Sequence, residues 1–455
     1  MNYKKIGFIS LILIISGVIL TYIVNATNQK EVLQSLFLSI PLVFAYLILF
    51  VRFLSSTFFF NIFYLMLFYL QPVVYYITSG YYNAELKEVK ILITLIVIGL
   101  HLFMIGSTLF TAKKKIYINI QIEYWKIRKV IKLTFLIAVS SIILLFVDAG
   151  TFNILGLDRL GLKNSGSIIR LIATFGLYLT SVLFFLIFFT ANIRTKYNLF
   201  FWVLFVVLFE VLVFIFFRTR SLMVVHLSAC IVGYYYSYAY YSAKYKVKSK
   251  KSIAFLFGVL ITLLSIVTRF FRGYLQPDSN IDKFELNWKV FLERSVENGD
   301  LGYSGIVLNV IHLVPNTYDY LSGQSYYRLL FIIIPRSIWP EKPNNTETIV
   351  GGWVHPSIEG MSLPPGIIGD LYINFGIFGV IFMVGYGVFF SFLDRKVSTK
   401  NFIVWSVSAT WIFHLVRGGF TNPIIIFTVL YIFIYTISKY YLKEEFIKKS
   451  NISNK

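Results

Sequence analysis

The sequence has few acidic residues and almost no cysteine. Among 455 residues it holds 21 Asp and Glu against 42 Lys and Arg, and charged residues make up only 14% of the chain. Its single cysteine, Cys230, lies inside a hydrophobic segment, so an intrachain disulfide is excluded and cysteine usage says nothing about the redox compartment. With 57% hydrophobic residues, the composition excludes an ordinary soluble domain.

Several familiar catalytic motifs are also absent. The sequence contains no Walker loop, no HExxH, no CxxC and no GxGxxG after a strand. It also has no DxD pair that could hold a metal ion against a nucleotide sugar. We therefore expect chemistry that uses neither ATP nor a nucleotide-bound metal, with no cofactor and no metal site.

Apolar runs of about 20 residues, the length that a helix needs to cross a bilayer, recur along the chain. They predict an all-α polytopic membrane protein with about twelve transmembrane helices in a single integral membrane domain, residues 1–455. The N-terminal run is long for a signal peptide and indicates a retained anchor. The predicted spans lie near residues 6–24, 32–51, 57–78, 88–110, 130–147, 168–191, 198–217, 221–242, 252–270, 371–392, 401–416 and 422–438.

The lysines predict the orientation of these spans. Lysine-rich segments such as Lys113 to Lys132 and Lys244 to Lys251 fall on one side, which the positive-inside rule assigns to the cytoplasm, together with both termini. Residues 269–370 then form one large extracytoplasmic loop, with a short helix expected over Gly302 to Leu313. The net charge of +21 comes from the cytoplasmic segments and favours membrane lipids rather than nucleic acid as partner.

The arginines do not follow the lysines. Of fourteen, only four fall in the predicted cytoplasmic segments. Arginine offers a planar fork that grips phosphate or carboxylate bidentately, so arginines on the outer face predict a site for a phosphorylated ligand. The bland alternative is that arginines at span ends extend to lipid headgroups. The basic residues expected at this site are Arg218, Arg220, Arg269, Arg272, Arg336, Lys342 and Arg417.

Three other residues are candidates for a general base. His355, Glu359 and Asp370 lie in or next to a glycine-rich stretch that precedes the tenth predicted span. Each has a structural alternative, and for Asp370 it is an acid at a helix N-terminus. His312 is a weaker candidate on an apolar stretch. Glu210, inside the seventh span, could orient an arginine or could satisfy a neighbouring helix.

The motifs of the second half of the chain resemble a known family. The RTRS turn, the FFRG segment, the PRSIWPEKP run, the PPGIIGDLYINFGIFGV run and the many-span architecture are similar to the Wzy-type polymerases of O-antigen and related polysaccharides. The resemblance runs from about Arg218 to Gly387, with Arg417 beyond it. The earlier spans share only their hydropathy with the family.

The resemblance implies a multi-span glycosyltransferase of the GT-C-like superclass in the bacterial inner membrane. Its substrates would be oligosaccharide repeat units on undecaprenyl diphosphate, and its product a surface polysaccharide such as O-antigen or capsule. A chain-length regulator and a repeat-unit flippase would be its partners. The basic residues would bind the diphosphate, while His355, Glu359 or Asp370 would accept the proton of the acceptor hydroxyl.

Two other readings fit parts of the sequence. An O-antigen ligase shares the layout and the chemistry but hands the polymer to a different acceptor. A lipid-linked oligosaccharide flippase or another transporter is the non-enzymatic alternative. Transporters usually show inverted repeats and charges near the middle of the membrane. This sequence shows no internal repeat, and its charges lie mostly at one face.

Overall fold

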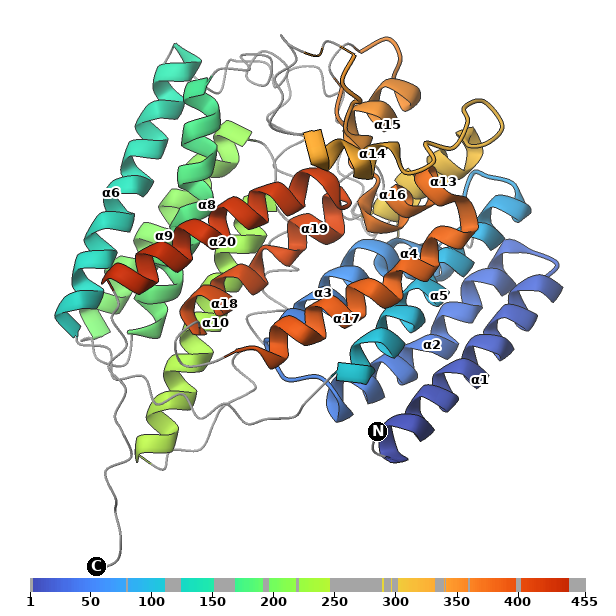
Figure 1. The fold of residues 1–455 in the computed structure, drawn as a ribbon, viewed down its shortest axis with the longest axis horizontal. Helices are drawn as coiled ribbons and strands as arrows, with labels where there is room; N and C mark the ends of the chain where they lie inside the picture. The colour runs from blue at the N-terminus through green and yellow to red at the C-terminus, as the bar shows by residue number, and fades with distance from the viewer. Residues whose placement is uncertain are drawn as a thin grey trace, which may run out of the picture. The chain divides into compact units, whose positions relative to one another are not determined.

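The structure is a computed structural model, and it describes residues 3–78, 81–110, 124–150, 168–190, 196–217, 221–245, 302–331, 341–358, 361–397 and 402–441, with single residues 289, 296 and 339. These parts of the chain are helical and contain no strand, which confirms the predicted all-α fold (Figure 1). The helices are α1 (Tyr3–Asn25), α2 (Gln29–Leu49), α3 (Ser56–Tyr64), η1 (Leu65–Tyr69), α4 (Leu70–Thr78), α5 (Leu86–Phe110), α6 (Tyr124–Ala149), α8 (Ile168–Phe189), α9 (Lys196–Phe217), α10 (Ser221–Tyr245), α13 (Tyr303–Leu313), α14 (Gln324–Tyr327), η4 (Arg328–Phe331), α15 (Thr346–Val354), α16 (Gly366–Phe375), η5 (Gly376–Ile381), α17 (Phe382–Arg395), α18 (Phe402–Thr410), α19 (Ile412–Gly418) and α20 (Thr421–Tyr441).

Seven helical segments of the described chain are long and apolar enough to cross a membrane. Each overlaps one of the predicted spans, and shorter apolar helices overlap four more. The remaining predicted span, 252–270, lies outside the described residues, so the total of twelve stays a prediction. The seven segments are Tyr3–Asn25, Gln29–Leu49, Ser56–Thr78, Leu86–Phe110, Lys129–Ala149, Ile172–Phe189 and Gly366–Arg395.

The chain divides into two compact units. Unit 1 comprises residues 1–114, 282–396 and 411–426, and unit 2 comprises the remaining segments, 115–281, 397–410 and 427–455. The chain passes from one unit to the other several times, so neither is a separate stretch of sequence. The expectation of a single integral membrane domain stays a prediction.

One glycine on each helix allows α5 and α17 to pack closely in unit 1. An added Cβ on Gly106 of α5 would collide with the carbonyl oxygen of Val384, and one on Gly387 of α17 would collide with that of Phe103. Small residues allow such close approach of two helix backbones in a membrane protein. By contrast, a Cβ on Gly385, two residues earlier in α17, would meet no atom within 4 Å. Gly385 therefore plays no part in the contact.

An aspartate joins the end of α17 to the start of α3. The Asp394 carboxylate accepts hydrogen bonds from the backbone N–H groups of Ser56 and Thr57, both at 2.9 Å, and from the Thr57 hydroxyl at 2.6 Å. The first N–H groups of a helix have no partner within the helix, and a carboxylate there also complements the helix dipole. This contact fixes one end of the unit 1 bundle.

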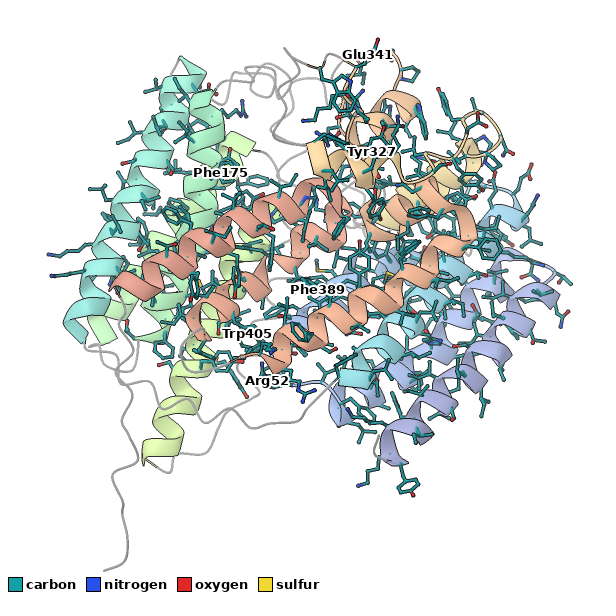
Figure 2. The ribbon with its side chains drawn as sticks, viewed as in Figure 1. Arg52, Phe175, Tyr327, Glu341, Phe389 and Trp405 are labelled. Carbon is teal, nitrogen blue, oxygen red and sulfur yellow. The ribbon has the colours of Figure 1, made fainter. Side chains whose placement is uncertain are left out.

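The outside of unit 1 is also apolar. Phe389 of α17 is 41% exposed and Ile48 of α2 is 72% exposed, and Figure 2 shows the Phe389 side chain on α17. Exposed apolar side chains along long apolar helices are what a membrane-facing surface requires. The arrangement is that of a membrane-embedded protein.

Segments from the predicted large loop pack into unit 1 beside these helices. The expected helix over Gly302 to Leu313 is confirmed as α13, which buries Val307 and Val310 completely. It packs against α5, α16 and the short helix α15, and Figure 1 shows these elements close together. The segment is therefore part of the packed core of unit 1, and it positions the site described next.

Candidate functional site

Asp370 is fully buried in α16, and its two carboxylate oxygens accept hydrogen bonds from two other parts of the chain. Oδ1 accepts from the Thr346 hydroxyl at 2.6 Å, and Oδ2 accepts from the backbone N–H of Phe420 at 3.2 Å. A buried carboxylate is costly unless it is paired with donors, so these bonds hold the three segments together. We call Thr346, Asp370 and Phe420 the Asp370 cluster.

The cluster joins stretches that the sequence had singled out separately. Thr346 follows the PRSIWPEKP run, Asp370 lies in the GDLYINFG run, and Phe420 closes the turn that begins with Arg417. The sequence placed Asp370 at a helix N-terminus, but α16 begins at Gly366 and Asp370 lies one turn inside it. Its carboxylate therefore holds two distant segments and does not cap its own helix.

Two glycines allow the turn after α19 to reach Asp370. Gly419 has a φ of +79°, and a Cβ there would lie 2.8 Å from the Cβ of Asp370. A Cβ on Gly418 would lie 2.8 Å from Glu347 Oε1. Glycine alone adopts this backbone conformation without strain and leaves room for both neighbours. The Arg-Gly-Gly sequence is thus explained by packing around the cluster.

Two tyrosines pack against the Phe420 ring. Tyr326 stacks on it with ring centroids 5.5 Å apart, and Tyr386 meets it edge-on at 5.8 Å. Burial of the Tyr326 hydroxyl, together with the nearby negative charge of Asp370, raises the pKa of this phenol well above its ordinary value. Tyr326 therefore stays protonated beside the carboxylate at neutral pH.

Asn374 ties the cluster to α14. Its side-chain amide donates to the backbone carbonyl of Asp370 at 2.7 Å and to the Ser325 hydroxyl at 2.8 Å. Both Asn374 and Ser325 are buried. This network fixes the helical turn that carries Asp370 against the segment that carries Tyr326.

Two of the predicted basic residues lie beside the cluster in the sequence and belong to the same unit. Arg417 is half-buried in α19, three residues before Phe420, with its guanidinium carbon 5.9 Å from the centre of the Tyr303 ring. Such a distance allows a cation–π attraction. Lys342 is buried, four residues before Thr346. Asp370 thus anchors the turn that carries one predicted diphosphate ligand and the segment that carries another.

The predicted base His355 has a different setting. It follows α15 as its C-terminal cap, and the helix separates it from Thr346 by about 13 Å along its axis. Within the described residues its imidazole makes no hydrogen bond. Its role as a base stays a prediction.

Asp370 holds its neighbours in place and has no exposed surface in this arrangement. It acts as a positioning residue for the Arg417 turn, and its predicted role as a proton acceptor would require the cluster to open. The other predicted site residues lie outside the described part of the chain, and their convergence stays a prediction. They are Arg218, Arg220, Arg269, Arg272, Arg336 and Glu359.

Unit 2 contains a second buried polar chain. His226 of α10 lies between Glu210 of α9 and Thr180 of α8, with 2.6 Å from Nδ1 to Glu210 Oε1 and 2.9 Å from Nε2 to the Thr180 hydroxyl. The sequence left open whether Glu210 orients an arginine or satisfies a neighbouring helix, and this geometry supports the second alternative. The partner of Glu210, His226, lies on another helix, so sequence spacing gave no signal for it.

Comparison with known proteins adds no relative. No family model, curated protein or solved structure matches the chain. The chemistry of the site is therefore that of its own residues: a buried carboxylate that anchors a turn, a half-buried guanidinium on that turn, and a buried lysine close to Thr346.

Proposed function

We propose that the chain is a glycosyltransferase of the bacterial inner membrane that polymerises oligosaccharide repeat units carried on undecaprenyl diphosphate. The growing chain on one lipid is the donor, and a hydroxyl on the terminal sugar of an incoming lipid-linked repeat unit is the acceptor. A glycosidic bond forms to that hydroxyl oxygen while the bond from the donor's anomeric carbon to the diphosphate breaks. Undecaprenyl diphosphate leaves, and the hydroxyl proton passes to a base.

The observation that carries this proposal is the Asp370 cluster. Its hydrogen bonds join Thr346 and Asp370, which lie beside and within two of the motifs that carry the family resemblance, to Phe420 at the end of the Arg417 turn. Their meeting around one carboxylate supports a shared site.

The chemistry that such a site would provide is electrostatic. The diphosphate gains negative charge as it leaves, and fixed guanidinium groups stabilise that charge in the transition state. Arg417 is held on a turn whose backbone is fixed by Gly418, Gly419 and the bond from Phe420 to Asp370. A guanidinium group that is already in place does not have to be reorganised during the reaction, and this preorganisation is what lowers the barrier.

The fold supports the choice of a lipid-linked substrate. Long apolar helices with apolar outer faces place the chain in a membrane, where a polyprenyl lipid also resides. In the proposed topology both termini are cytoplasmic, and the segment that contains Thr346 faces outward with the diphosphate site. The Arg417 turn lies at that same outer end of the spans.

The proposal is tested by the surface glycans of a deletion strain. Loss of a polymerase leaves single repeat units attached to the final acceptor, and complementation with the wild-type gene restores the ladder of longer chains. Loss of a ligase would instead leave long polymer on undecaprenyl diphosphate, and loss of a flippase would leave single units on the cytoplasmic face. Either of these outcomes, or an unchanged ladder, contradicts the proposal.

A further inference from the structure

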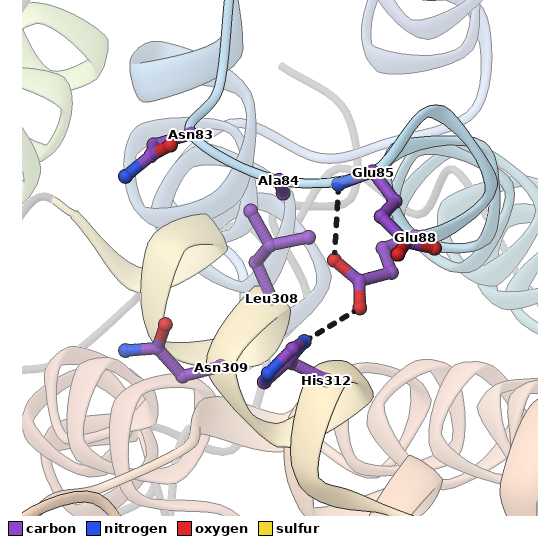
Figure 3. A pocket seen from close by; sticks show the side chains of 7 residues that line it. All are labelled: Asn83, Ala84, Glu85, Glu88, Leu308, Asn309 and His312. Carbon is purple, nitrogen blue, oxygen red and sulfur yellow. Dashed lines mark hydrogen bonds and ion pairs between the residues drawn. The ribbon is translucent and has the colours of Figure 1, made fainter. Parts of the chain in front are cut away.

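A second polar site lies in unit 1, and its lining includes none of the described basic residues discussed above. A cavity of about 380 Å³ opens between the loop that precedes α5 and one face of α13 (Figure 3). The described part of its lining contains two carboxylates, two side-chain amides and an imidazole, and no lysine or arginine. The lining residues are Asn83, Ala84, Glu85, Glu88, Leu308, Asn309 and His312.

Glu88 is the fixed point of this cavity. Its Oε2 accepts the backbone N–H of Glu85 at 3.2 Å, and its Oε1 lies 2.7 Å from Nδ1 of His312. Figure 3 shows the carboxylate between these two partners. The first bond holds the side chain in the first turn of α5. The second bond therefore has a rigid acceptor, although its two residues are 224 positions apart in the sequence.

The bond to Glu88 also determines what His312 offers to a ligand. A carboxylate accepts the proton of Nδ1, so in the neutral form of the ring Nε2 is a hydrogen-bond acceptor. The His312 side chain is 69% exposed, and within the described residues Nε2 has no hydrogen-bond partner. An oriented ring with an accessible second nitrogen suits a ligand that donates a hydrogen bond.

The charge of the lining excludes one part of the substrate and favours another. Glu85 and Glu88 would repel a diphosphate, and no lysine or arginine among the described lining residues offsets them. Sugar hydroxyls can donate to carboxylates and to Nε2, and they can accept from the amides of Asn83 and Asn309. The set of groups matches an uncharged ligand rich in hydroxyls.

We infer that this cavity, which we call the Glu88–His312 pocket, binds the sugar portion of the repeat unit, with a sugar hydroxyl donating to Nε2 of His312. The inference rests on the proposed function for the identity of the glycan. It assigns sugar and diphosphate to different groups of residues: the acidic and amide pocket takes the sugars, while basic residues such as Arg417 take the diphosphate.

Binding to the purified full chain in detergent tests this assignment. The first probe is the single repeat-unit oligosaccharide, without lipid or diphosphate, released from the surface polysaccharide of the native host. The second probe is farnesyl diphosphate, which has the diphosphate and no sugar. Saturation-transfer NMR detects the first probe even at weak affinity, and competition between the probes shows whether their sites are separate.

The key variant is Asn309→Trp, which fills the cavity without touching the bond between Glu88 and His312. Its matched control is Asn25→Trp, at an exposed asparagine at the end of α1 and outside the lining. We expect Asn309→Trp to weaken oligosaccharide binding at least about tenfold, a change of about 1.4 kcal/mol. The control should change it less than about twofold, and farnesyl diphosphate should bind all three proteins equally.

A second variant removes the acceptor nitrogen. His312→Gln should also weaken the oligosaccharide, and thermal unfolding of each variant shows that the fold is intact. Failure of the wild-type protein to bind the oligosaccharide, or equal binding by wild type and Asn309→Trp, overturns the inference. Binding that depends on the pocket in a protein whose deletion leaves the polysaccharide ladder unchanged would retain the pocket and overturn the polymerase instead.

Discussion

The carboxylate of Asp370 accepts the backbone N–H of Phe420 at 3.2 Å, across fifty positions of sequence. The same carboxylate binds the Thr346 hydroxyl through its other oxygen. One buried acid therefore determines where the Arg417 turn lies relative to α16. The position of Arg417 therefore depends on the hydrogen bond between Phe420 and Asp370. Four variants of unit 1 test this bond and its consequences.

Replacing Asp370 by Asn keeps the volume of the side chain but turns one acceptor oxygen into a donor. If the amide NH2 lies toward Phe420, two donors face each other; if it lies toward Thr346, the hydroxyl must accept a bond and gives up the one that it donates to Asp370. We expect a loss of about 1–3 kcal/mol in the free energy of unfolding, measured by thermal unfolding in detergent. Asp319→Asn, at an exposed acid of the same unit, is the control and should cost less than about 0.5 kcal/mol. Equal stability of the two variants would argue against the cluster.

Adding a methyl group at Gly419 tests the turn itself. Gly419→Ala must adopt a positive φ and place its Cβ against Asp370, so we expect it to destabilise the protein by about 1–3 kcal/mol. Gly385→Ala is the matched control, because its Cβ would meet no atom within 4 Å and alanine favours the helix. The control should leave the melting temperature unchanged or higher. A Gly419→Ala protein as stable as this control would show that the turn has another conformation.

Replacing Arg417 tests whether its guanidinium stabilises the leaving diphosphate. If its guanidinium stabilises the leaving diphosphate, Arg417→Ala should lower the rate of polymer formation about 10²–10³-fold at normal expression. Arg417→Lys keeps the charge but loses the planar fork, so we expect an intermediate rate. Arg395→Ala, at the exposed end of α17, serves as the control and should keep wild-type polymer length. Wild-type rates in Arg417→Ala membranes would remove this residue from the site.

Tyr326 gives a pH signature. Because the pKa of its phenol is raised in the folded protein, the folded state favours the protonated form. The contribution of Tyr326 to the free energy of unfolding is fully present below the ordinary tyrosine pKa of about 10. It is lost as the pH rises above that value. The melting temperature of the wild type should therefore fall more steeply than that of Tyr326→Phe between about pH 9 and 11. Parallel curves would mean that this hydroxyl is not buried beside Asp370.

The sequence predicted what depends on local pattern. Apolar runs of span length indicated the long helices, and the stretch from Gly302 to Leu313 indicated α13. Asp370 and Arg417 were also selected, because an acid and an arginine beside membrane segments are unusual. These features can be recognised within a window of about 20 residues.

Long-range partners could not be predicted in the same way. The bonds of Asp370 to Thr346 and Phe420, and the bond of His312 to Glu88, join residues on different helices. Without Glu88 in view, His312 ranked below His355, although within the described residues His312 has a carboxylate partner and His355 has none. The difference between Gly387 and Gly385 likewise depends on which face of α17 meets α5.

The most direct measurement is a polymerisation assay with the purified full chain in lipid vesicles. The substrate is the native lipid-linked repeat unit, and the products are separated by size after release from the lipid. Our account predicts a ladder of products that differ by one repeat unit, formed together with free undecaprenyl diphosphate and much reduced by Arg417→Ala. If correctly folded wild-type protein yields only the single repeat unit, the result contradicts this prediction. A ladder that forms equally well with Arg417→Ala contradicts it as well.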